Sequence, residues 1–494
     1  MLYIRMLLTM AVTLYTSRVV LNVLGIEDFG IYNVVGGFVA MVGFLKNSMA
    51  VATQRFLSFE IGNNDFAQLK RVFSMSMTIH FIIAFIILIL AETIGLWFVN
   101  TQLTIPPERM EAARWVYHFS VLAFIVNVIS VPYNATIIAH ERMNVFAYVS
   151  ILDVSLKLFI VFVLQWFGFD KLKFYAVLMF SVALIIRIIY GIYCSRNFNE
   201  TKYHFFWDSK LLKTILSFSG WSIWESLASI INAQGVNILL NMFFGPAINA
   251  ARAIAYQARA ALNNFVYNFQ IALKPQIIKS YAINNLTYMH QLVFQGARYS
   301  FFLLFILSLP ILLETEFILR LWLKIVPEYT IIFTRLVIVN ILLNSYSSTL
   351  STAAQATGRI KNFQLVSGGL ILLILPISLF FLKLGYEPQV TLYVSITIEA
   401  FALLSRLFIL KNLVQLKIKI FLKKVVAQTI FASIIASLFP IIISHCLDET
   451  LMEILIIFIV SFTSSIAIIY SIGLTKNEKQ YLNTILRQLK SKIF

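Results

Sequence analysis

The stretch VFSMSMTIHFIIAFIILILAETIGLWF, residues 72–98, decides the fold class of this 494-residue chain. An α-helix needs about 20 apolar residues to cross the hydrocarbon core of a membrane, and this stretch is longer. It contains a carboxylate, Glu92, but neither lysine nor arginine. Because peptide groups in lipid must be hydrogen-bonded within the segment, such a run predicts a transmembrane helix.

The composition of the whole chain agrees with that stretch. Hydrophobic residues make up 60% of the chain, charged residues only 12%, and the mean hydropathy is +0.85. An ordinary soluble domain carries roughly 25% charged residues, so the composition excludes a typical soluble enzyme. It also excludes an intrinsically disordered chain, which is polar and poor in apolar residues.

Apolar runs of membrane-spanning length recur along the chain, and we predict an all-α polytopic membrane protein with about 14 transmembrane helices. The first, second, seventh and eighth runs are the least hydrophobic. The predicted spans are 2–24, 30–52, 72–98, 113–138, 146–167, 173–194, 214–243, 247–273, 298–319, 329–354, 363–383, 390–411, 424–445 and 452–474.

The net charge of +17 is explained by the loops between these runs. Lysine and arginine number 23 in one alternating set of connections and 7 in the other. The positive-inside rule therefore predicts a membrane protein with both termini in the cytoplasm, and we expect no nucleic-acid partner. Because the chain opens almost inside the first run, we expect a short cytoplasmic leader to precede it. Cys194 and Cys446 are predicted near opposite membrane faces, so we expect neither a disulfide nor a metal cluster.

An internal repeat divides the chain. The stretch Arg18–Gly62 resembles Asn237–Ala282: each has an LN-containing apolar run, a glycine turn, a span rich in small and polar residues, and a basic end. This predicts two six-helix lobes, as in secondary transporters whose site lies between the halves. The predicted divisions are an N-terminal lobe 1–200, a C-terminal lobe 201–418, two extra spans 419–475, and a basic amphipathic cytoplasmic tail 476–494 that lies on anionic lipid.

Polar residues gather in the predicted spans 7 and 8. In span 8 they recur every three or four residues and so share one helix face. Such a stripe favours a water-filled cavity; the alternative is a polar seam packed against another helix. Glu225 either pairs with an arginine of the stripe or is a coupling site for H⁺ or Na⁺. The residues concerned are Glu225, Asn232 and Asn237 in span 7, and Asn249, Arg252, Tyr256, Arg259 and Asn263 in span 8.

Spans 1 and 2 add Arg18 and Lys46 to the predicted site, whereas Asp153 and Lys157 in span 5 are four residues apart and predict an internal ion pair. Guanidinium groups bind phosphates through two hydrogen bonds, and amides and hydroxyls suit sugars. A substrate with a diphosphate and a glycan fits this basic cavity. We expect no catalytic residue, no metal ligand and no cofactor.

The segments LGIEDFGIYNVVGGF (residues 24–38) and KNSMAVATQRFLS (residues 46–58) resemble the polysaccharide exporters of the O-antigen flippase type. These belong to the multidrug/oligosaccharidyl-lipid/polysaccharide (MOP) transporter superfamily. The resemblance implies that a polyprenyl-diphosphate-linked oligosaccharide is moved from the cytoplasmic to the periplasmic leaflet by alternating access. It also implies a place in the bacterial inner membrane. We expect a monomer that works among membrane lipids, with a glycan polymerase and assembly proteins as partners. In related lipid II flippases, arginines of spans 1, 2 and 8 hold the diphosphate; Arg18, Lys46 and Arg252 are the nearest counterparts here, with Arg259 as an added candidate.

Two other functions stay open. An ion-coupled multidrug or small-molecule efflux pump of the same superfamily would favour acidic residues in its cavity, and Glu225 is the main acidic residue here. A polytopic glycosyltransferase or glycan polymerase would use an acidic pair such as Glu27–Asp28 in the first external loop. However, no connection is long enough for an external domain, and phosphate-loop and HExxH motifs are missing, so we do not expect an enzyme.

Overall fold

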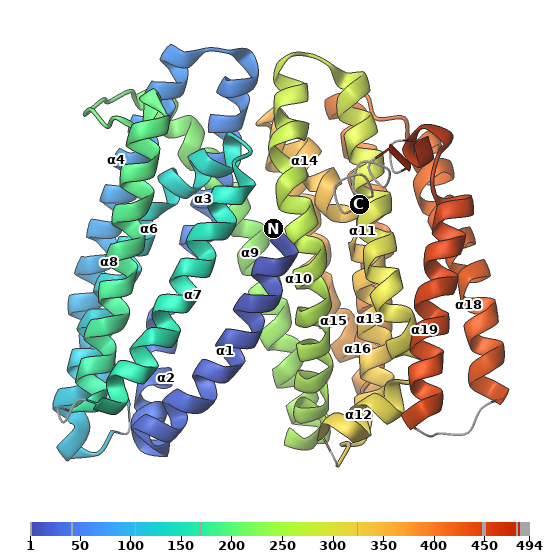
Figure 1. Cartoon of the computed structure of the whole chain (residues 1–494), viewed down its shortest axis with the longest axis horizontal. Coiled ribbons are helices and arrows are strands. Elements are labelled where there is room, and N and C mark those ends of the chain that lie inside the picture. The colour runs from blue at the N-terminus through green and yellow to red at the C-terminus, as the bar shows by residue number, and fades with distance from the viewer. Residues whose placement is uncertain are drawn as a thin grey trace, which may run out of the picture. The chain divides into compact units, whose positions relative to one another are not determined.

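The structure is a computed structural model that describes residues 2–40, 43–103, 105–166, 170–323, 325–446, 451–480 and 483–484. Over these residues the chain forms helices and turns and no β-strand (Figure 1). The predicted all-α class is confirmed.

In the described residues of the N-terminal half, eight α-helices precede the two longest helices. They are α1 (Leu2–Leu24), α2 (Ile26–Ala40), α3 (Gly43–Asn63), α4 (Phe66–Leu90), α5 (Leu96–Thr101), α6 (Met110–Ala139), α7 (Met143–Trp166) and α8 (Lys171–Asn197). A π-helical turn, Ala91–Gly95, joins α4 to α5, and short 3₁₀ turns lie at Pro107–Arg109 and Asn199–Thr201.

The rest of the chain begins with the two longest helices. The helices are α9 (Ser209–Phe244), α10 (Pro246–Ala282), α11 (Leu286–Leu313), α12 (Thr315–Leu323), α13 (Thr330–Asn344), α14 (Ser347–Thr357), α15 (Lys361–Lys383), α16 (Val390–Val414), α17 (Ile418–Phe421), α18 (Gln428–Cys446) and α19 (Leu451–Ile468). π-Helical turns cover Leu422–Ala427 and Ile469–Gly473.

Each predicted span overlaps one or two of these helices. Among the described residues, twelve helical segments are long and apolar enough to cross a membrane. The two predicted spans outside this set are the second, which corresponds to α2 and α3, and the eighth, which corresponds to α10. Both are helical. The sequence of α10 is too polar for this criterion, whereas the second span is divided between α2, which has only 15 residues, and the more polar α3.

The chain divides into two compact units, each described by itself. Unit 1 comprises Met1–Leu227 and Lys274–Asn285, and unit 2 comprises Ala228–Leu273 and Leu286–Phe494. The borders therefore fall inside α9 and α10. The division into units does not test the repeat borders predicted at residues 200 and 418. A repeat is defined by sequence similarity, whereas these units are defined by contacts within the structure.

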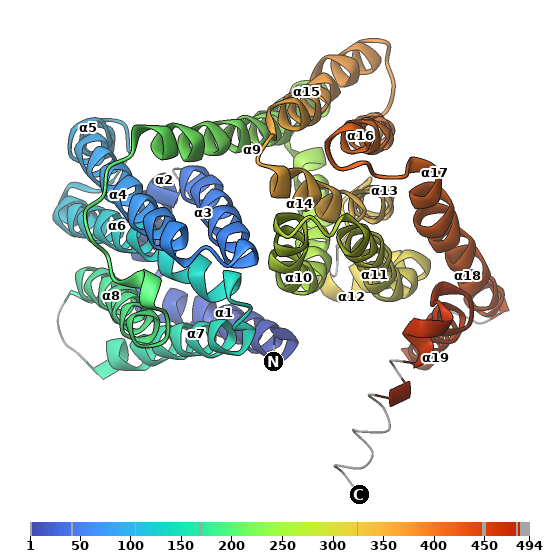
Figure 2. The same ribbon diagram turned by 90° about the horizontal axis from the view of Figure 1, so that it is seen from above.

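In unit 1, α6 is the central helix. It packs against α2, α3, α4 and α8, and α1 packs along α7 (Figure 2). Small residues such as Ala112 and Ala113 let neighbouring helices approach, and Tyr117 is fully buried and donates its hydroxyl to the carbonyl of Ala91 at 2.7 Å.

The segments that connect the helices of unit 1 form two sets of contacts. Successive connections of membrane-spanning helices are expected at alternate ends of the helices. In one set, Glu141 between α6 and α7 accepts from Lys279 at 2.6 Å and from Gln276 at 3.1 Å, both near the end of α10. Gly62 at the end of α3 lies so close to this part of α10 that a Cβ atom would come within 2.8 Å of the Ala282 Cβ. The loop count assigns these connections to the cytoplasmic side.

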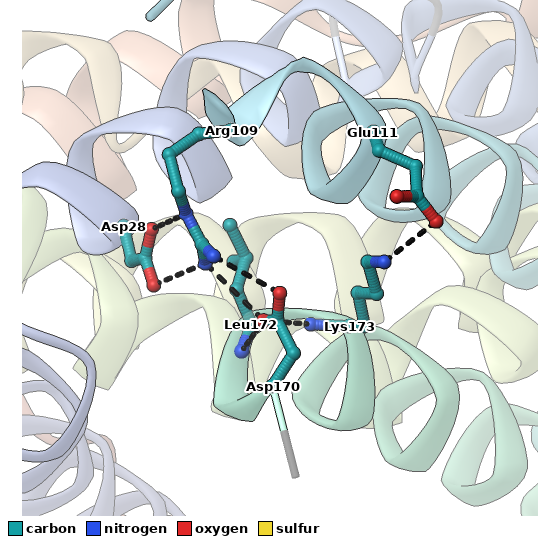
Figure 3. A network of polar contacts seen from close by, with 6 residues as sticks. All are labelled: Asp28, Arg109, Glu111, Asp170, Leu172 and Lys173. Atoms are coloured by element: carbon teal, nitrogen blue, oxygen red, sulfur yellow. Dashed lines mark hydrogen bonds and ion pairs between the residues drawn. The ribbon is translucent and has the colours of Figure 1, made fainter. Parts of the chain in front are cut away.

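The second set of connections is joined by Arg109. Its guanidinium lies between Asp28 of α2 and Asp170, which caps α8 (Figure 3). The Nη2 atom is 2.5 Å from Asp28 Oδ2, and Nη1 is 2.9 Å from Asp170 Oδ2. Beside them, Lys173 donates to Glu111 at 2.7 Å. One arginine thus ties together three segments that are far apart in the sequence.

Unit 2 is built around α16, which packs against α13, α14 and α15, while α18 and α19 pack against each other and against α11. The start of the tail is fixed by Glu478, whose carboxylate accepts from the buried Arg298 and, at 3.0 Å, from Gln295. Residues 476–480 are helical, as predicted for the tail. Residues 481–482 and 485–494 lie outside the described part, so the amphipathic tail helix stays a prediction.

The two repeat copies share one local geometry. Gly25 joins α1 to α2 with a φ of +83°, and Gly245 joins α9 to α10 with a φ of +81°. This left-handed conformation costs an L-residue about 1–2 kcal/mol, so glycine at each turn follows from the sharp reversal between two helices.

We predict that Gly25→Ala lowers the stability of unit 1 by about 1 kcal/mol, the cost of a Cβ atom in a left-handed conformation. Nothing lies within 4 Å of the added Cβ, so the loss would come from the backbone alone. The matched control is Gly30→Ala, which also adds a methyl group in open space but inside α2. The measurement is the thermal unfolding midpoint of the purified variants. Equal midpoints for Gly25→Ala and Gly30→Ala would contradict the prediction.

A second prediction concerns pH. Partial burial raises the pKa of Asp170, but hydrogen bonds from Arg109 and from two backbone N–H groups outweigh it, so that the pKa is lowered overall. The ion pair therefore stabilises the fold above the ordinary aspartate pKa of about 3.9 and is lost as the pH falls through the lower folded value. Asp170→Asn keeps a capping oxygen but not the charge. Its unfolding midpoint is expected a few degrees below wild type at pH 7, and the difference is expected to shrink as the pH falls below the ordinary aspartate pKa of about 3.9 toward the lowered folded value.

Candidate functional site

The candidate site in unit 2 is a polar stripe along α10. Pro246 occupies the first turn of the helix, where its missing N–H costs nothing. From there Asn249, Arg252, Tyr256 and Arg259 follow at spacings of three and four, which places them on one face. Arg252 is buried, with 6% of its surface exposed, and the exposed Asn263 continues the stripe.

Arg252 is held by neutral groups. Its Nη1 donates to the Oδ1 atom of Asn237 on α9 and, more weakly at 3.4 Å, to the carbonyl of Ala233. Its Nη2 donates to the Tyr256 hydroxyl at 3.2 Å, and its Cζ lies 4.3 Å from the centre of the Tyr256 ring. Every one of these partners is uncharged, so the full positive charge of Arg252 is retained at the site.

Arg259 approaches the same aromatic ring. Its Cζ lies 5.4 Å from the ring centre of Tyr256, within the range of a cation–π interaction. Within the described residues, no carboxylate lies within 4.0 Å of the guanidinium of Arg252 or of Arg259. Two cations thus share one ring, and the local charge balance is positive.

Several polar atoms around this stripe are buried without a hydrogen-bond partner. They include Nε of Arg252 and the side-chain oxygens of Asn232 and Asn249. Buried polar groups are normally paired with protein or water, so these atoms mark a place that water or a polar ligand would complete. The set offers one charged donor and two amide acceptors.

Buried arginines elsewhere in unit 2 are different. Arg298 pairs with Glu478, and Arg406 pairs with Glu399 at 2.6 Å and also donates to Ser347. Sequence reasoning missed the Arg406–Glu399 pair. The signal was available, because residues seven apart lie on the same face of a helix.

The remaining predicted site residues, Arg18, Lys46 and Glu225, belong to unit 1. Arg18 is exposed on α1, Lys46 is partly buried on α3, and Glu225 is partly buried on α9. Seven predicted residues therefore lie in unit 2 and three in unit 1. Their convergence on one cavity, and the pairing of Glu225 with an arginine, stay predictions because the units are described separately.

Two other sequence predictions can be compared with the contacts. The internal ion pair of span 5 is confirmed, since Lys157 Nζ lies 2.7 Å from Asp153 Oδ2. The acidic pair Glu27–Asp28 was the feature that suggested a glycan polymerase, but the Asp28 carboxylate is engaged by Arg109. Among the described residues, no group of three or more histidine, cysteine, aspartate or glutamate side chains could hold a metal ion.

Comparison with known proteins identifies structures with a similar fold, but no family model or curated protein with a similar sequence. No protein-family model matches the sequence, and no curated protein matches it. Solved structures do match. One of them is an outward-facing multidrug resistance MATE family transporter of the MOP superfamily. It has a TM-score of 0.72 and 14% sequence identity, and the match covers 84% of this chain and 94% of that chain.

Two further structures show the same likeness. One is described as a MOP superfamily transporter from Pyrococcus furiosus Vc1 (DSM3638) in which reverse polarity of the binding pocket suggests a different function; its TM-score is 0.69 at 13% identity, covering 84% of this chain and 94% of that one. The other is the MATE transporter ClbM in complex with Rb⁺, with a TM-score of 0.65 at 16% identity and coverage of 85% and 95%. This chain has the fold of the MATE transporters of the MOP superfamily.

Proposed function

We propose that this chain is a membrane transporter for an anionic amphipathic substrate, a polyprenyl-diphosphate-linked oligosaccharide that it moves from the cytoplasmic to the periplasmic leaflet. The observation that carries the proposal is the pair of guanidinium groups, Arg252 and Arg259, on one tyrosine ring with no carboxylate beside them in the described structure. Charge of this kind inside a membrane helix is costly and is retained for a substrate or ion pathway.

The chemistry of the site fits a diphosphate and a glycan. A guanidinium carries five N–H donors in a planar fork that matches two phosphate oxygens. Arg252 still has an unpartnered Nε donor, and Arg259 makes only its ring contact among the described residues. The amide oxygens of Asn232 and Asn249 are acceptors for sugar hydroxyl groups. The prenyl chain would stay in the lipid.

A second candidate function is ion-coupled efflux of multidrug or small-molecule substrates. The observation in its favour is the comparison itself, because one of the matching structures is described as a multidrug resistance transporter and the polysaccharide exporters are not among the structures compared above. The polarity of the site is the observation against it. A cationic drug would meet two arginines, whereas an anion would be attracted to them.

The energy source is a separate part of the proposal. Glu225 is the proposed coupling residue for H⁺ or Na⁺, because it is the main carboxylate of the predicted stripe on α9. The assembly proteins and glycan polymerase stay proposed partners. A glycosyltransferase or polymerase activity is not proposed, since Asp28 is held by Arg109.

The decisive experiment replaces Arg252 and Arg259 by glutamine in cells that lack the native gene. Surface glycan and the lipid-linked precursor are measured together. Each single variant is expected to lower glycan export at least about tenfold, because a hydrogen bond to a charged group contributes about 1.5–3 kcal/mol. The precursor should accumulate while the amount of protein in the membrane is unchanged.

The matched control is Arg359→Gln, which removes the same charge from an exposed loop position. Normal glycan export by the Arg252→Gln/Arg259→Gln double variant would reject the anion site. Drug sensitivity of the deletion strain with normal surface glycan would support the efflux function in its place.

Tyr256 allows a finer test of the same site. Tyr256→Phe keeps the ring that both guanidinium groups face and loses only the hydrogen bond from Arg252. Tyr256→Leu loses the aromatic ring as well as that hydrogen bond. We predict that export falls less than about fivefold in the first variant and more than tenfold in the second, because a partly desolvated cation–π contact contributes up to about 2 kcal/mol for each cation. Equal activity of the two variants would show that the ring has no such role.

A further inference from the structure

An extended segment of unit 1 presents aromatic and basic side chains on one surface. It is the stretch KYHFFWD, residues 202–208, which connects the 3₁₀ turn after α8 to the start of α9 and has no helical structure. We call it the strap. Nothing in the proposed transport site uses it, and it is distinct from the C-terminal tail.

The strap is fixed along α4. Tyr203 and Thr78 share a hydrogen bond of 3.3 Å between their hydroxyl oxygens, and Nδ1 of His204 lies 3.1 Å from the hydroxyl oxygen of Ser74. The ring of Tyr203 also packs edge-on against Phe81, with centroids 5.8 Å apart. Because these contacts run back along α4 as the strap proceeds, the strap is antiparallel to the helix.

The end of the strap reaches the first turns of α4. The guanidinium of Arg71 lies 5.8 Å from the ring centre of Phe206. From Phe81 to Arg71 the helix rises about 15 Å, at 1.5 Å per residue. Such a length exceeds the thickness of one headgroup layer, which is about 5–8 Å. The strap thus extends from the apolar part of α4 to its polar end.

Both ends of the strap are held as well. Before it, Glu200 accepts from His140 at 2.6 Å, and the His140 ring stacks on Phe198 with centroids 4.2 Å apart. After it, Asp208 caps α9 by accepting from the backbone N–H of Lys210 at 2.8 Å. The exposed side chains of the strap are therefore presented by a fixed backbone.

The outward surface of the strap is aromatic. Phe205 is 74% exposed, Trp207 50% and Tyr203 40%. Neighbouring Phe81 and Phe85 on α4 are also exposed, so the aromatic surface continues onto the apolar face of the helix. Aromatic side chains of this kind are enriched where a membrane protein crosses the boundary between lipid and water.

Cations surround these rings. The exposed basic residues on the strap and on the adjoining ends of α4, α8 and α9 are Lys70, Arg71, Arg196, Lys202, Lys210 and Lys213. Nearby carboxylates are engaged: Glu200 pairs with His140, and Asp65 and Asp208 cap helices. The surface therefore carries a net positive charge, on the side that the loop count assigns to the cytoplasm.

We propose that the strap and these flanking cations form a docking surface for anionic phospholipid headgroups of the cytoplasmic leaflet. The lysines and arginines bind the phosphates, and Phe205 and Trp207 insert at the level of the glycerol groups. Both parts are needed, since exposed aromatics alone would suit any lipid and exposed cations alone would suit any anion. The inference is independent of the transport site, because it uses no residue of α10.

The test measures quenching of Trp207 by brominated lipids in the full-length protein reconstituted in nanodiscs. The difference in fluorescence between wild type and Trp207→Phe isolates the contribution of this tryptophan. Brominated phosphatidylglycerol is expected to quench that contribution with an apparent affinity at least about fivefold higher than brominated phosphatidylcholine. This is the factor that one cation provides near an anionic surface.

The charge variant Lys202→Gln/Lys210→Gln/Lys213→Gln removes three of the six cations and should weaken this preference. Its matched control, Lys417→Gln/Lys419→Gln/Lys423→Gln, removes the same charge from exposed positions in unit 2 and should keep it. Unfolding midpoints check that both variants are folded. Equal quenching by the two lipids in wild type, equal loss in both variants, or no quenching of Trp207 by either lipid, as if a protein partner covered the strap, would each overturn the proposal.

Discussion

A guanidinium group inside a membrane helix must find partners, and this requirement explains how α10 is built. Arg252 is buried, yet its partners are an amide, a backbone carbonyl and a phenol. Arg298 and Arg406 are equally buried but face glutamates. The first arrangement leaves a positive charge in the unit, and the second removes it. Burial of arginine is therefore common in this protein, and only the absence of a facing carboxylate makes Arg252 and Arg259 a candidate site.

The same requirement explains which helices depart from the apolar pattern. α10 is a continuous helix of 37 residues, but its polar stripe keeps it below the hydropathy of a membrane span. The second predicted span differs, because it is divided between the apolar α2, of 15 residues, and the more polar α3. These two regions are the corresponding parts of the predicted internal repeat. In transporters built from repeats, the site lies where the corresponding elements of the two halves are unusual.

Sequence reasoning succeeded where the physics is local. Apolar length predicted the positions of the helices, and a spacing of four predicted the Asp153–Lys157 pair. A spacing of three and four also placed the arginines of α10 on one face. It did not succeed where distant segments meet. The contacts of Arg109 were not predicted, because nothing in its neighbourhood in the sequence indicates that Asp28 and Asp170 lie beside it. The strap was likewise missed, since its contacts with Ser74 and Thr78 join residues more than 120 apart.

The likeness to MATE transporters at 13–16% identity is a likeness of fold. At this identity the helices and their packing are shared, while the side chains of a site are free to differ, so function has to be argued from the site. Two unit charges 6 Å apart interact by about 3 kcal/mol at an effective dielectric constant of 20. A pair of arginines without carboxylates therefore disfavours a cation and favours an anion. Under the proposed function, this charge is the feature that separates a lipid-linked diphosphate from a cationic drug.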